Sequence, residues 1–449
     1  MDIEDSSIYE EIKEIQESGP KPVYHRYVVE INTEDDSIEP YQTTLLDVER
    51  DYAHNYGDVI VLTVKLSKND FIHRLYPHRE NFTVTLTREP VGEIDGDDDY
   101  DFDTTTRTYQ GVLLDGATAD LESARIQDTH EKEMEKEPPE EYRIQLIDPA
   151  VERLRVKTTG GIYRQMRTDD VIRGALSSAA SDLDLDEDED IAGVDVVDGD
   201  NENEREHVII PHGTPVMELA RFIQDHAGGV YNTGIGTYIQ GGTWFVYPRF
   251  HARRFDEVDD NLTILNIPEG RLPAIERTYL LDGDGQLIVL ATDETVETDV
   301  SEKIQYNLGT GLRYINADRY LKDFHQTQDN ISTVEKDDNV KEYTIHQRQA
   351  DRVMAMFSPE RITSNDYVQN ARLAEARGSY VRVRWENADP ALLYPGQPVR
   401  FVWMEQDGVN ERFGCLLGAD FVSAPQSAGG KVSRFATVVD MTVFLEKDD

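Results

Sequence analysis

The stretch at 214–248, TPVMELARFIQDHAGGVYNTGIGTYIQGGTWFVYP, carries the signals of a helix followed by a β-hairpin. Thr214-Pro215 is expected to start the helix, because proline is favoured at the first helical position, and Gly228-Gly229 is expected to end it. Gly241-Gly242 then lies between two runs rich in β-branched and aromatic residues, which predicts a hairpin turn. The expected buried stripe of the helix is Val216, Leu219, Ala220, Phe222 and Ile223. The stretch therefore predicts a small α+β module.

A second helix is expected upstream of this module. Thr168 is expected to begin and cap it, and its apolar face is expected to be Val171, Ile172, Ala175, Leu176 and Ala179. The residues that follow, Ser181–Glu206, contain 13 acids and one arginine. So dense a set of like charges predicts a flexible, solvated loop.

Strand patterns dominate on both sides of the helical region. Short alternating runs with turn residues between them predict a small barrel or sandwich. In the first region these runs are Tyr27–Ile31, Val59–Leu66, Phe82–Thr87, Tyr109–Leu114 and Tyr142–Ile147. In the last region, a helix capped by Ser364 is expected to precede strands at Val381–Trp385, Val399–Trp403, Phe413–Val422 and Phe435–Leu445.

The sequence therefore predicts an α+β fold that is mainly β, with two small β-barrel domains flanking inserted α+β domains. The expected divisions are an acidic N-terminal segment at 1–20, a first β-barrel domain at 21–148, an inserted α+β region at 149–275, a β connection at 276–320 and a second β-barrel domain at 321–449.

Composition excludes several classes of function. The 449 residues carry a formal net charge of −44, which disfavours stable binding to nucleic acid or to an anionic membrane. The single cysteine, Cys415, excludes an intrachain disulfide and a cysteine-based metal site. No apolar run approaches the ~20 residues that span a bilayer, and the acidic start does not resemble an export signal. We therefore expect a soluble protein that does not insert into membranes.

No motif nominates a catalytic, cofactor-binding or metal-binding residue. The metalloprotease, Walker, nucleophile-elbow and dinucleotide-binding patterns are absent from the sequence. Gly234-Ile235-Gly236 is read as a turn. The histidine pairs His73/His78 and His207/His212 are five residues apart, a spacing that does not suit metal ligation on one helix face, so packing or surface roles are expected.

Two acidic runs have the alternating spacing of a calcium loop: Asp97, Asp99, Asp101 and Asp103, and then Asp184, Asp186 and Asp188. Neither has the glycine that the loop requires for its bend, and the first also lacks the final glutamate. Solvated acidic loops at 93–103 and 131–141 are therefore favoured over a calcium site.

The densest aromatic group of the chain is Tyr231, Tyr238, Trp244, Phe245 and Tyr247. Aromatic residues of this kind can line a sugar or peptide groove. In a hairpin packed under a helix they are more often core, and core packing is the expectation.

Four segments, in order, resemble the baseplate or tail hub proteins of tailed phages, which are related to phage late-control proteins and to the hub part of type VI secretion spikes. The segments are GIYRQMRTDDVIRGAL, the stretch at 214–248 quoted above, YNLGTGLRYINADRYLKDF, and NARLAEARGSYVRVRWENADPALLYPGQPVRFV. The motifs are patterns of helix, hairpin and Pro-Gly turn and include no catalytic signature.

The resemblance implies a non-enzymatic homotrimer without cofactors. Each subunit would contribute two tube-type barrels to a ring that joins a sixfold tail tube to a threefold central spike. The implied partners are the tube protein, the spike, other baseplate proteins and passing DNA that is not specifically bound, in a virion tail assembled in the host cytoplasm. An acidic lumen would repel DNA phosphates.

Arg382 and Arg384 beside Trp385 are the expected subunit-interface residues. Two other classes of function remain open at this point. One is a tail-associated enzyme that degrades peptidoglycan or polysaccharide, with the aromatic group as its groove. The other is an extracellular calcium-dependent adhesin.

Overall fold

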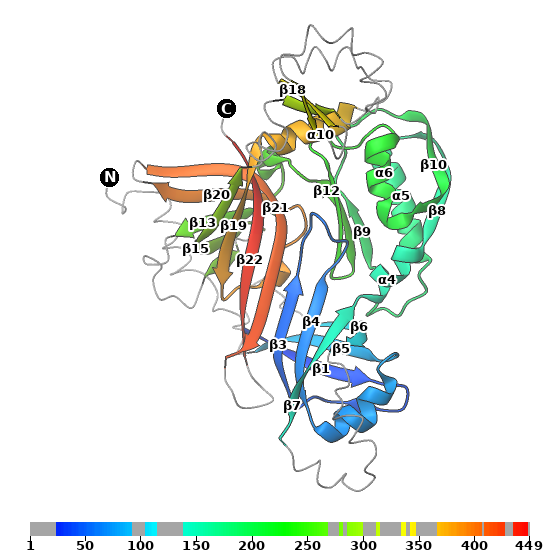
Figure 1. Cartoon of the computed structure of the whole chain (residues 1–449), viewed down its shortest axis with the longest axis vertical. Helices are drawn as coiled ribbons and strands as arrows, with labels where there is room; N and C mark the ends of the chain where they lie inside the picture. The colour runs from blue at the N-terminus through cyan, green and yellow to red at the C-terminus, as the bar shows by residue number, and fades with distance from the viewer. Residues whose placement is uncertain are drawn as a thin grey trace.

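The computed structural model describes residues 24–91, 104–114, 138–267, 278–281, 285–299, 311–314, 334–337, 342–346, 366–405, 408–426 and 434–447. Within these residues the chain is mainly β, and one large sheet system lies beside a smaller α/β insert (Figure 1). The acidic segment at 1–20, the Asp97–Asp103 run and Ser364 lie outside the described residues.

The described strands of the large sheet follow one hydrogen-bonded path, β13-β20-β21-β3-β4-β7-β6-β5-β1-β22-β19-β15-β14, with β2 paired to β1. Their bounds are β1 (Tyr24–Asn32), β2 (Ser37–Ile38), β3 (Gln42–Glu49), β4 (Val59–Leu66), β5 (Thr83–Val91), β6 (Thr105–Leu113), β7 (Glu140–Ile147), β13 (Leu262–Ile267), β14 (Tyr279–Leu281), β15 (Leu287–Asp299), β19 (Gly378–Glu386), β20 (Pro398–Glu405), β21 (Gly408–Pro425) and β22 (Phe435–Glu446). Of the predicted strands, Val59–Leu66 has the predicted bounds, and the others are confirmed with shifted ends.

Two further pairings close this path into two circuits of strands. β21 pairs with β22 over a long antiparallel register, and this completes a first circuit through β3, β4, β7, β6, β5 and β1. The β1–β22 join in that circuit is a single pair, His25 with Phe435. β13 pairs in parallel with both β15 and β20, and this completes a second circuit through β21, β22 and β19.

The prediction of two barrel domains is not confirmed, because the circuits are not separate units. The β21–β22 hairpin belongs to both circuits, and β21 pairs with β3 through Phe421 and Val48. β13 falls in the predicted 149–275 insert, yet it pairs with β20 of the predicted second barrel. Strands far apart in sequence therefore share one sheet, and the expected domain boundaries do not divide it.

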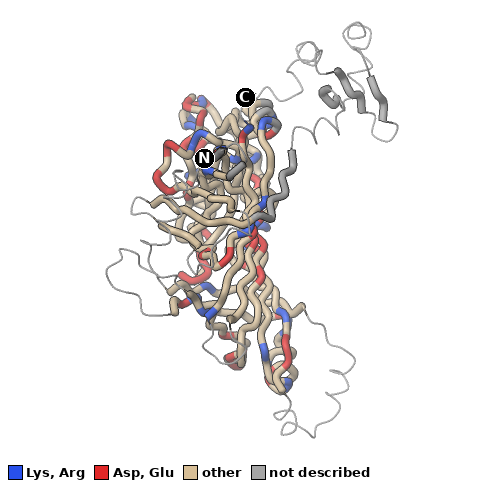
Figure 2. The backbone as a smooth tube through the Cα atoms, turned by 90° about the vertical axis from the view of Figure 1, so that its left-hand side faces the viewer, with Lys and Arg blue, Asp and Glu red and all other residues tan. Residues whose placement is uncertain are grey.

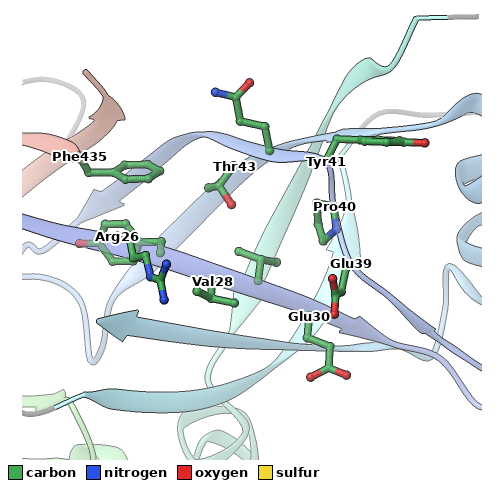
Figure 3. Close-up of a pocket in the computed structure, with 11 residues that line it drawn as sticks. Arg26, Val28, Glu30, Glu39, Pro40, Tyr41, Thr43 and Phe435 are labelled. Carbon is green, nitrogen blue, oxygen red and sulfur yellow. The ribbon is translucent and has the colours of Figure 1, made fainter. Parts of the chain in front are cut away.

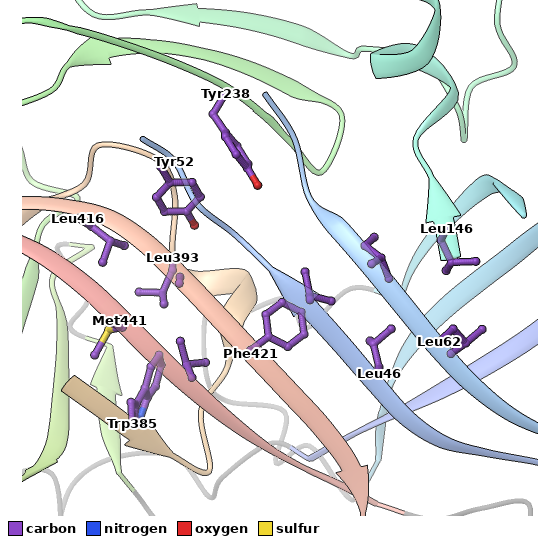
Figure 4. Packing of buried hydrophobic residues seen from close by; sticks show 14 of the residues in the cluster. Leu46, Tyr52, Leu62, Leu146, Tyr238, Trp385, Leu393, Leu416, Phe421 and Met441 are labelled. Atoms are coloured by element: carbon purple, nitrogen blue, oxygen red, sulfur yellow. The ribbon is translucent and has the colours of Figure 1, made fainter. Parts of the chain in front are cut away.

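One hydrophobic core runs through both circuits. Alternation along β19 buries Val381, Val383 and Trp385, as the sequence predicts. Leu46, Leu62 and Leu146 of the first circuit belong to the same buried cluster as Trp385 and Met441 of the second (Figure 4). The continuity of this core makes the two circuits one body.

The insert has its own core under two short sheets. Its elements are α4 (Pro149–Val156), β8 (Thr158–Met166), α5 (Thr168–Ser181), β9 (Gly193–Val196), β10 (Arg205–Pro215), η4 (Val216–Glu218), α6 (Leu219–His226), β11 (Ile235–Gln240) and β12 (Thr243–Pro248). Among the described strands β8 pairs only with β10, and β11 pairs with β12, which also accepts β9 in parallel. The predicted hairpin is confirmed, with positive φ angles at Gly241 and Gly242.

The helices differ from expectation mainly at their starts. α5 begins at Thr168, but Arg167 is the N-cap residue, and the Thr168 hydroxyl donates to the Gly229 carbonyl at 2.8 Å. Residues Thr214-Pro215 end β10, so the second helix begins later, at Val216 in 3-10 form. The predicted apolar faces of both helices are confirmed, with Phe222 only partly buried.

The flexible loop predicted for Ser181–Glu206 is wrong in its secondary structure. Residues Gly193–Val196 form β9, which is in register with β12, and β10 starts at Arg205. Val194 pairs with Trp244 and Val196 with Val246, so alternating valines insert this acidic segment into a sheet. The many acidic residues of this segment obscured the sequence pattern of a short strand, in which Val196 is buried.

The remaining described elements are shorter. A π-helix, η2 (Asp70–Leu75), and a 3-10 turn, η3 (Tyr76–His78), follow β4. The chain also contains η5 (Ala252–Glu257), η8 (Pro390–Leu392), α10 (Asp366–Ala376) and a sheet of β16 (Gly311–Tyr314), β18 (Glu342–His346) and β17 (Val334–Asp337). None of the described helices is long and apolar enough to cross a membrane.

Candidate functional site

The aromatic group predicted at 231–247 is buried core. Tyr231, Tyr238, Trp244 and Tyr247 are at most 1% exposed. Phe245 is partly buried and stacks on Tyr394, with ring centroids 6.2 Å apart. Core packing is therefore confirmed for this group, and the four buried rings cannot line an accessible groove.

The hairpin that carries these rings is covered on both faces. Strand alternation sends Trp244 and Val246 into the core of the insert, while Tyr238 and Tyr247 enter the core of the circuits. The Tyr247 hydroxyl donates to the Tyr52 carbonyl at 2.9 Å, inside the circuits. The hairpin thus joins the two cores, and this accounts for its aromatic density.

A largely buried ion pair, with side chains 12% and 16% exposed, lies where the hairpin meets the circuits. Arg50 Nε contacts the two carboxylate oxygens of Asp58 at 3.2 and 3.1 Å, and Arg50 Nη1 donates to the Pro390 carbonyl at 2.9 Å. The Tyr238 hydroxyl of the hairpin donates to Asp58 Oδ1 at 2.9 Å. We call Arg50, Asp58 and Tyr238 the junction, since it joins strands of both circuits to the insert.

The electrostatics of the junction keep its groups in fixed ionisation states. Burial by itself lowers the pKa of Arg50, but the adjacent Asp58 carboxylate more than offsets this, so the pKa is raised and the charge is retained. Burial raises the pKa of Tyr238, with Asp58 as the next cause, and this tyrosine remains a neutral donor. Arg50 and Tyr238 therefore position chain segments and do not exchange protons near neutral pH.

A second polar cluster lies near the single-pair join of the first circuit. Arg88 Nη2 donates to His25 Nδ1 at 2.9 Å and to Asp389 Oδ1 at 2.5 Å. Asp389 also accepts from the backbone N–H of Ala391 at 3.0 Å and so caps η8. Burial, followed by repulsion from Arg88, lowers the pKa of His25 to about 4. His25 is therefore neutral at physiological pH.

A third clamp holds the acidic segment of the insert against β6. Arg107 Nη2 donates to Asp148 Oδ2 at 2.9 Å, and Arg107 Nη1 donates to the Asp190 carbonyl at 3.0 Å. The Thr108 N–H donates to the Asp188 carbonyl at 3.2 Å. Sequence reasoning missed all three clusters, because each includes partners that are far apart in the chain, such as Tyr238 and Asp58.

The other predicted site residues are not assembled into a site. His207 and His212 are exposed on β10, and His73 is exposed on the π-helix. No group of three or more potential metal ligands lies close together in the described residues, which include Asp184, Asp186 and Asp188.

Cys415 and Gly234 lie where their residue types suggest, the thiol in the core and the glycine at a positive φ angle. Cys415 is buried, and burial raises the pKa of its thiol to about 12. Gly234 has φ +85 and follows the turn at Asn232-Thr233, whereas Ile235 and Gly236 already belong to β11, so the turn predicted at Gly234-Ile235-Gly236 lies earlier in the chain.

The interface predicted around Trp385 is wrong for that residue. Trp385 is fully buried in its own chain, and its Nε1–H donates to Thr278 Oγ1 at 3.0 Å. Arg382 and Arg384 point to the opposite face of β19 and pair with Asp440 of β22 at 3.4 and 3.1 Å. The two arginines are therefore neutralised within the sheet.

A shallow hollow of about 190 Å³ lies beside β1 (Figure 3). It lies between β1 and the β2–β3 turn, with Phe435 of β22 at one end. Val28 and Tyr41 on its rim are 44% and 53% exposed. Acidic and basic positions elsewhere are distributed over both the circuits and the insert (Figure 2).

Comparisons with known proteins gave matches in structure alone. No protein-family model matches the chain, and no curated protein matches its sequence. The fold is similar to a tail protein from Neisseria meningitidis, at 11% identity and a TM-score of 0.43, covering 93% of this chain and 96% of that one.

Two further solved structures are of the same kind. The 43 kDa tail protein of prophage MuSo2 from Shewanella oneidensis matches at 8% identity and a TM-score of 0.44, covering 93% of this chain and 98% of that one. A topological model of the p2 virion baseplate matches at 8% identity and a TM-score of 0.29, covering 94% and 100%. These three structures are of tail and baseplate proteins.

Proposed function

We propose that the chain is a non-catalytic structural hub of a phage tail baseplate or tail tip. Three copies would form a ring that joins the sixfold tail tube to the threefold central spike and lines the DNA channel. The proposed partners are the tube protein, the spike and other baseplate proteins, within the virion. The proposed role is of the same class as that of the tail and baseplate proteins named above.

The observation that carries the proposal is the β21–β22 hairpin shared by the two strand circuits. Each chain presents two circuits fixed to each other by shared strands and a common core. Three such chains would offer six circuits, the number that a sixfold tube requires, in units that cannot shear apart without breaking sheet hydrogen bonds. This agrees with the role that the sequence resemblance implies.

The charge of the chain suits passage of DNA without binding. A formal charge of −44 per subunit would repel phosphates and would provide no release of counterions to hold DNA in the channel. The same charge opposes ring closure at low salt, because like-charged subunits repel one another over about one Debye length.

Mass measurement by light scattering across a salt series tests the proposal. We expect a species of three times the 51.2 kDa subunit mass, favoured as salt rises and subunit repulsion is screened. A stable dimer at all salt concentrations, or a monomer that joins neither copies of itself nor purified tail tubes, would contradict the hub.

The absence of catalysis is tested separately with purified peptidoglycan and capsular polysaccharide. We expect no clearing above the background of a heat-inactivated sample. Clearing that a single Asp or Glu substitution abolishes would replace the structural proposal with the enzymatic one.

A further inference from the structure

The outward face of the β8–β10 ribbon exposes a matched pair of isoleucines. Ile162 and Ile209 are direct cross-strand partners, and they are 61% and 60% exposed. The ribbon is otherwise folded normally, since Val208 and Ile210 alternate with Ile209 and are buried in the insert core. Two large β-branched side chains side by side on a two-stranded ribbon form an exposed hydrophobic surface of a kind that proteins usually cover.

Basic residues accompany the isoleucine pair. Arg164 and His207 are the next cross-strand pair along the same face, two residues from Ile162 and Ile209. Arg155, beside the 83% exposed Val156, stands just before β8 begins. Neither Arg155 nor Arg164 has an ion pair with another described residue. In a chain of net charge −44, this face is locally apolar and positive.

The insert also has a surface of opposite character. The stretch Asp182–Asp190 holds seven carboxylates in nine residues. Asp184, Asp186 and Glu187 are exposed, and none of them has an ion pair within the described part of the chain. Burial, and then repulsion from Asp188 and Asp186, raises the pKa of Glu189 in spite of the nearby Arg153.

The acidic stretch is held in place. Its backbone is fixed to β6 by Arg107 and Thr108, and Arg153 Nη1 donates to the carbonyls of Leu183 and Asp184 at 2.5 and 3.0 Å. A fixed acidic surface loses less conformational entropy on binding than a mobile one. The insert thus presents a basic and apolar face and, at Asp184, Asp186 and Glu187, an acidic face without ion pairs among the described residues, although Asp182 pairs with Lys157.

We propose that the outward face of the β8–β10 ribbon binds the acidic stretch Asp182–Asp190 of a second copy of this chain. Because the two faces differ, the contact is head to tail, the kind that repeats around a ring. Ile162 and Ile209 form the apolar centre, and Arg164 supplies the charge that selects the acidic partner. The contact rests on the proposed ring and identifies where its subunits meet.

Sedimentation velocity on the full chain and its variants tests the contact. We expect Ile162→Thr with Ile209→Thr to weaken self-association on the order of tenfold or more, since these side chains lie at the centre of the interface. Arg164→Glu is expected to weaken it by a similar factor at low salt. Adding Asp186→Lys and Glu187→Lys to Arg164→Glu is expected to restore association, because the charges are then exchanged across the interface.

Matched controls are Val28→Thr and Arg79→Glu, which make the same chemical changes on exposed residues of the first circuit. We expect both to associate as the wild type does. The effect of Arg164→Glu should shrink as salt rises, whereas that of the isoleucine changes should persist.

The outcomes separate the contact from the ring. A wild-type trimer that the ribbon variants leave intact would overturn the contact and leave the hub standing. A wild-type dimer that the same variants dissociate would support the contact and overturn the threefold ring. Ribbon variants that self-associate normally but no longer bind an added tube or spike protein would show that a different protein occupies this face.

Discussion

The insert contains two β-ribbons whose surroundings differ. β11–β12 lies between two cores, and both of its faces carry large buried side chains such as Tyr238 and Trp244. β8–β10 has one face on the insert core and leaves Ile162 and Ile209 exposed on the other. In this chain, a high density of aromatic residues indicates a hairpin that is buried on both faces and does not indicate a binding groove. The exposed apolar surface lies instead on β8–β10, whose residues are less conspicuous in the sequence.

The comparison is tested most strongly by Trp244→Ala in the covered hairpin. Removing this fully buried ring should lower the free energy of unfolding by about 3–5 kcal/mol, because transfer energy is lost and a cavity remains. Urea denaturation followed by circular dichroism measures the change. Phe245→Ala, on the partly buried side chain, is the control and should cost less. Equal losses would mean that the two positions are equally covered.

The junction is expected to give the next largest effect. Asp58→Ala leaves the buried Arg50 charge and the Tyr238 hydroxyl without their partner, and should cost about 3 kcal/mol. The matched control is Glu141→Ala, whose ion pair with Lys65 is more exposed and should contribute less than about 1 kcal/mol. A loss at Asp58 no greater than the control would show that the junction does not hold the hairpin to the circuits.

How far the sequence predicts these features depends on whether their signals are local. The Gly241-Gly242 turn and the alternation of Val381, Val383 and Trp385 are local patterns, and the structure confirms them. β9 was missed because acidic residues surround its two valines, although the alternation of Val194 and Val196 was the available signal.

Long-range partners had no comparable signal. Arg50 is joined to Asp420, 370 residues away, through its backbone N–H. The sharing of β21–β22 between two circuits, and the parallel pairing of β13, depend on contacts that no periodicity encodes. The exposed isoleucines were missed for a related reason, since an apolar strand residue is expected to be buried.

Measuring stability over a pH series compares the buried His25 with the exposed His207. His25 is buried beside Arg88, and its pKa is lowered to about 4 from 6.5. The unfolded chain therefore binds a proton at higher pH than the folded chain does, and stability falls as pH drops from 6.5 toward 4. Replacing His25 with Gln should remove roughly 3 kcal/mol of this loss, since each pKa unit corresponds to about 1.4 kcal/mol. The exposed His207→Gln is the control, and a response equal to that of His25→Gln would contradict the buried assignment.

The smallest effect is expected at the uncovered ribbon. Ile162→Thr with Ile209→Thr, in dilute monomer, should change the free energy of unfolding by less than about 0.5 kcal/mol, because both side chains already face solvent. Urea denaturation at low protein concentration measures this. A loss comparable to that of Trp244→Ala would mean that the pair is structural, and would remove the premise of the head-to-tail contact.

The shared hairpin also has a consequence for the order in which the chain can fold. β21 and β22 lie at residues 408–446, yet they complete a circuit that begins with β1 at residue 24. During synthesis at roughly 5–20 residues per second, strands β1 to β7 must wait for the last-made hairpin before either circuit can close. The insert, whose contacts are nearer in sequence, can form meanwhile. Chains that stop short of β22 would leave both circuits open, so only complete copies could enter an assembly.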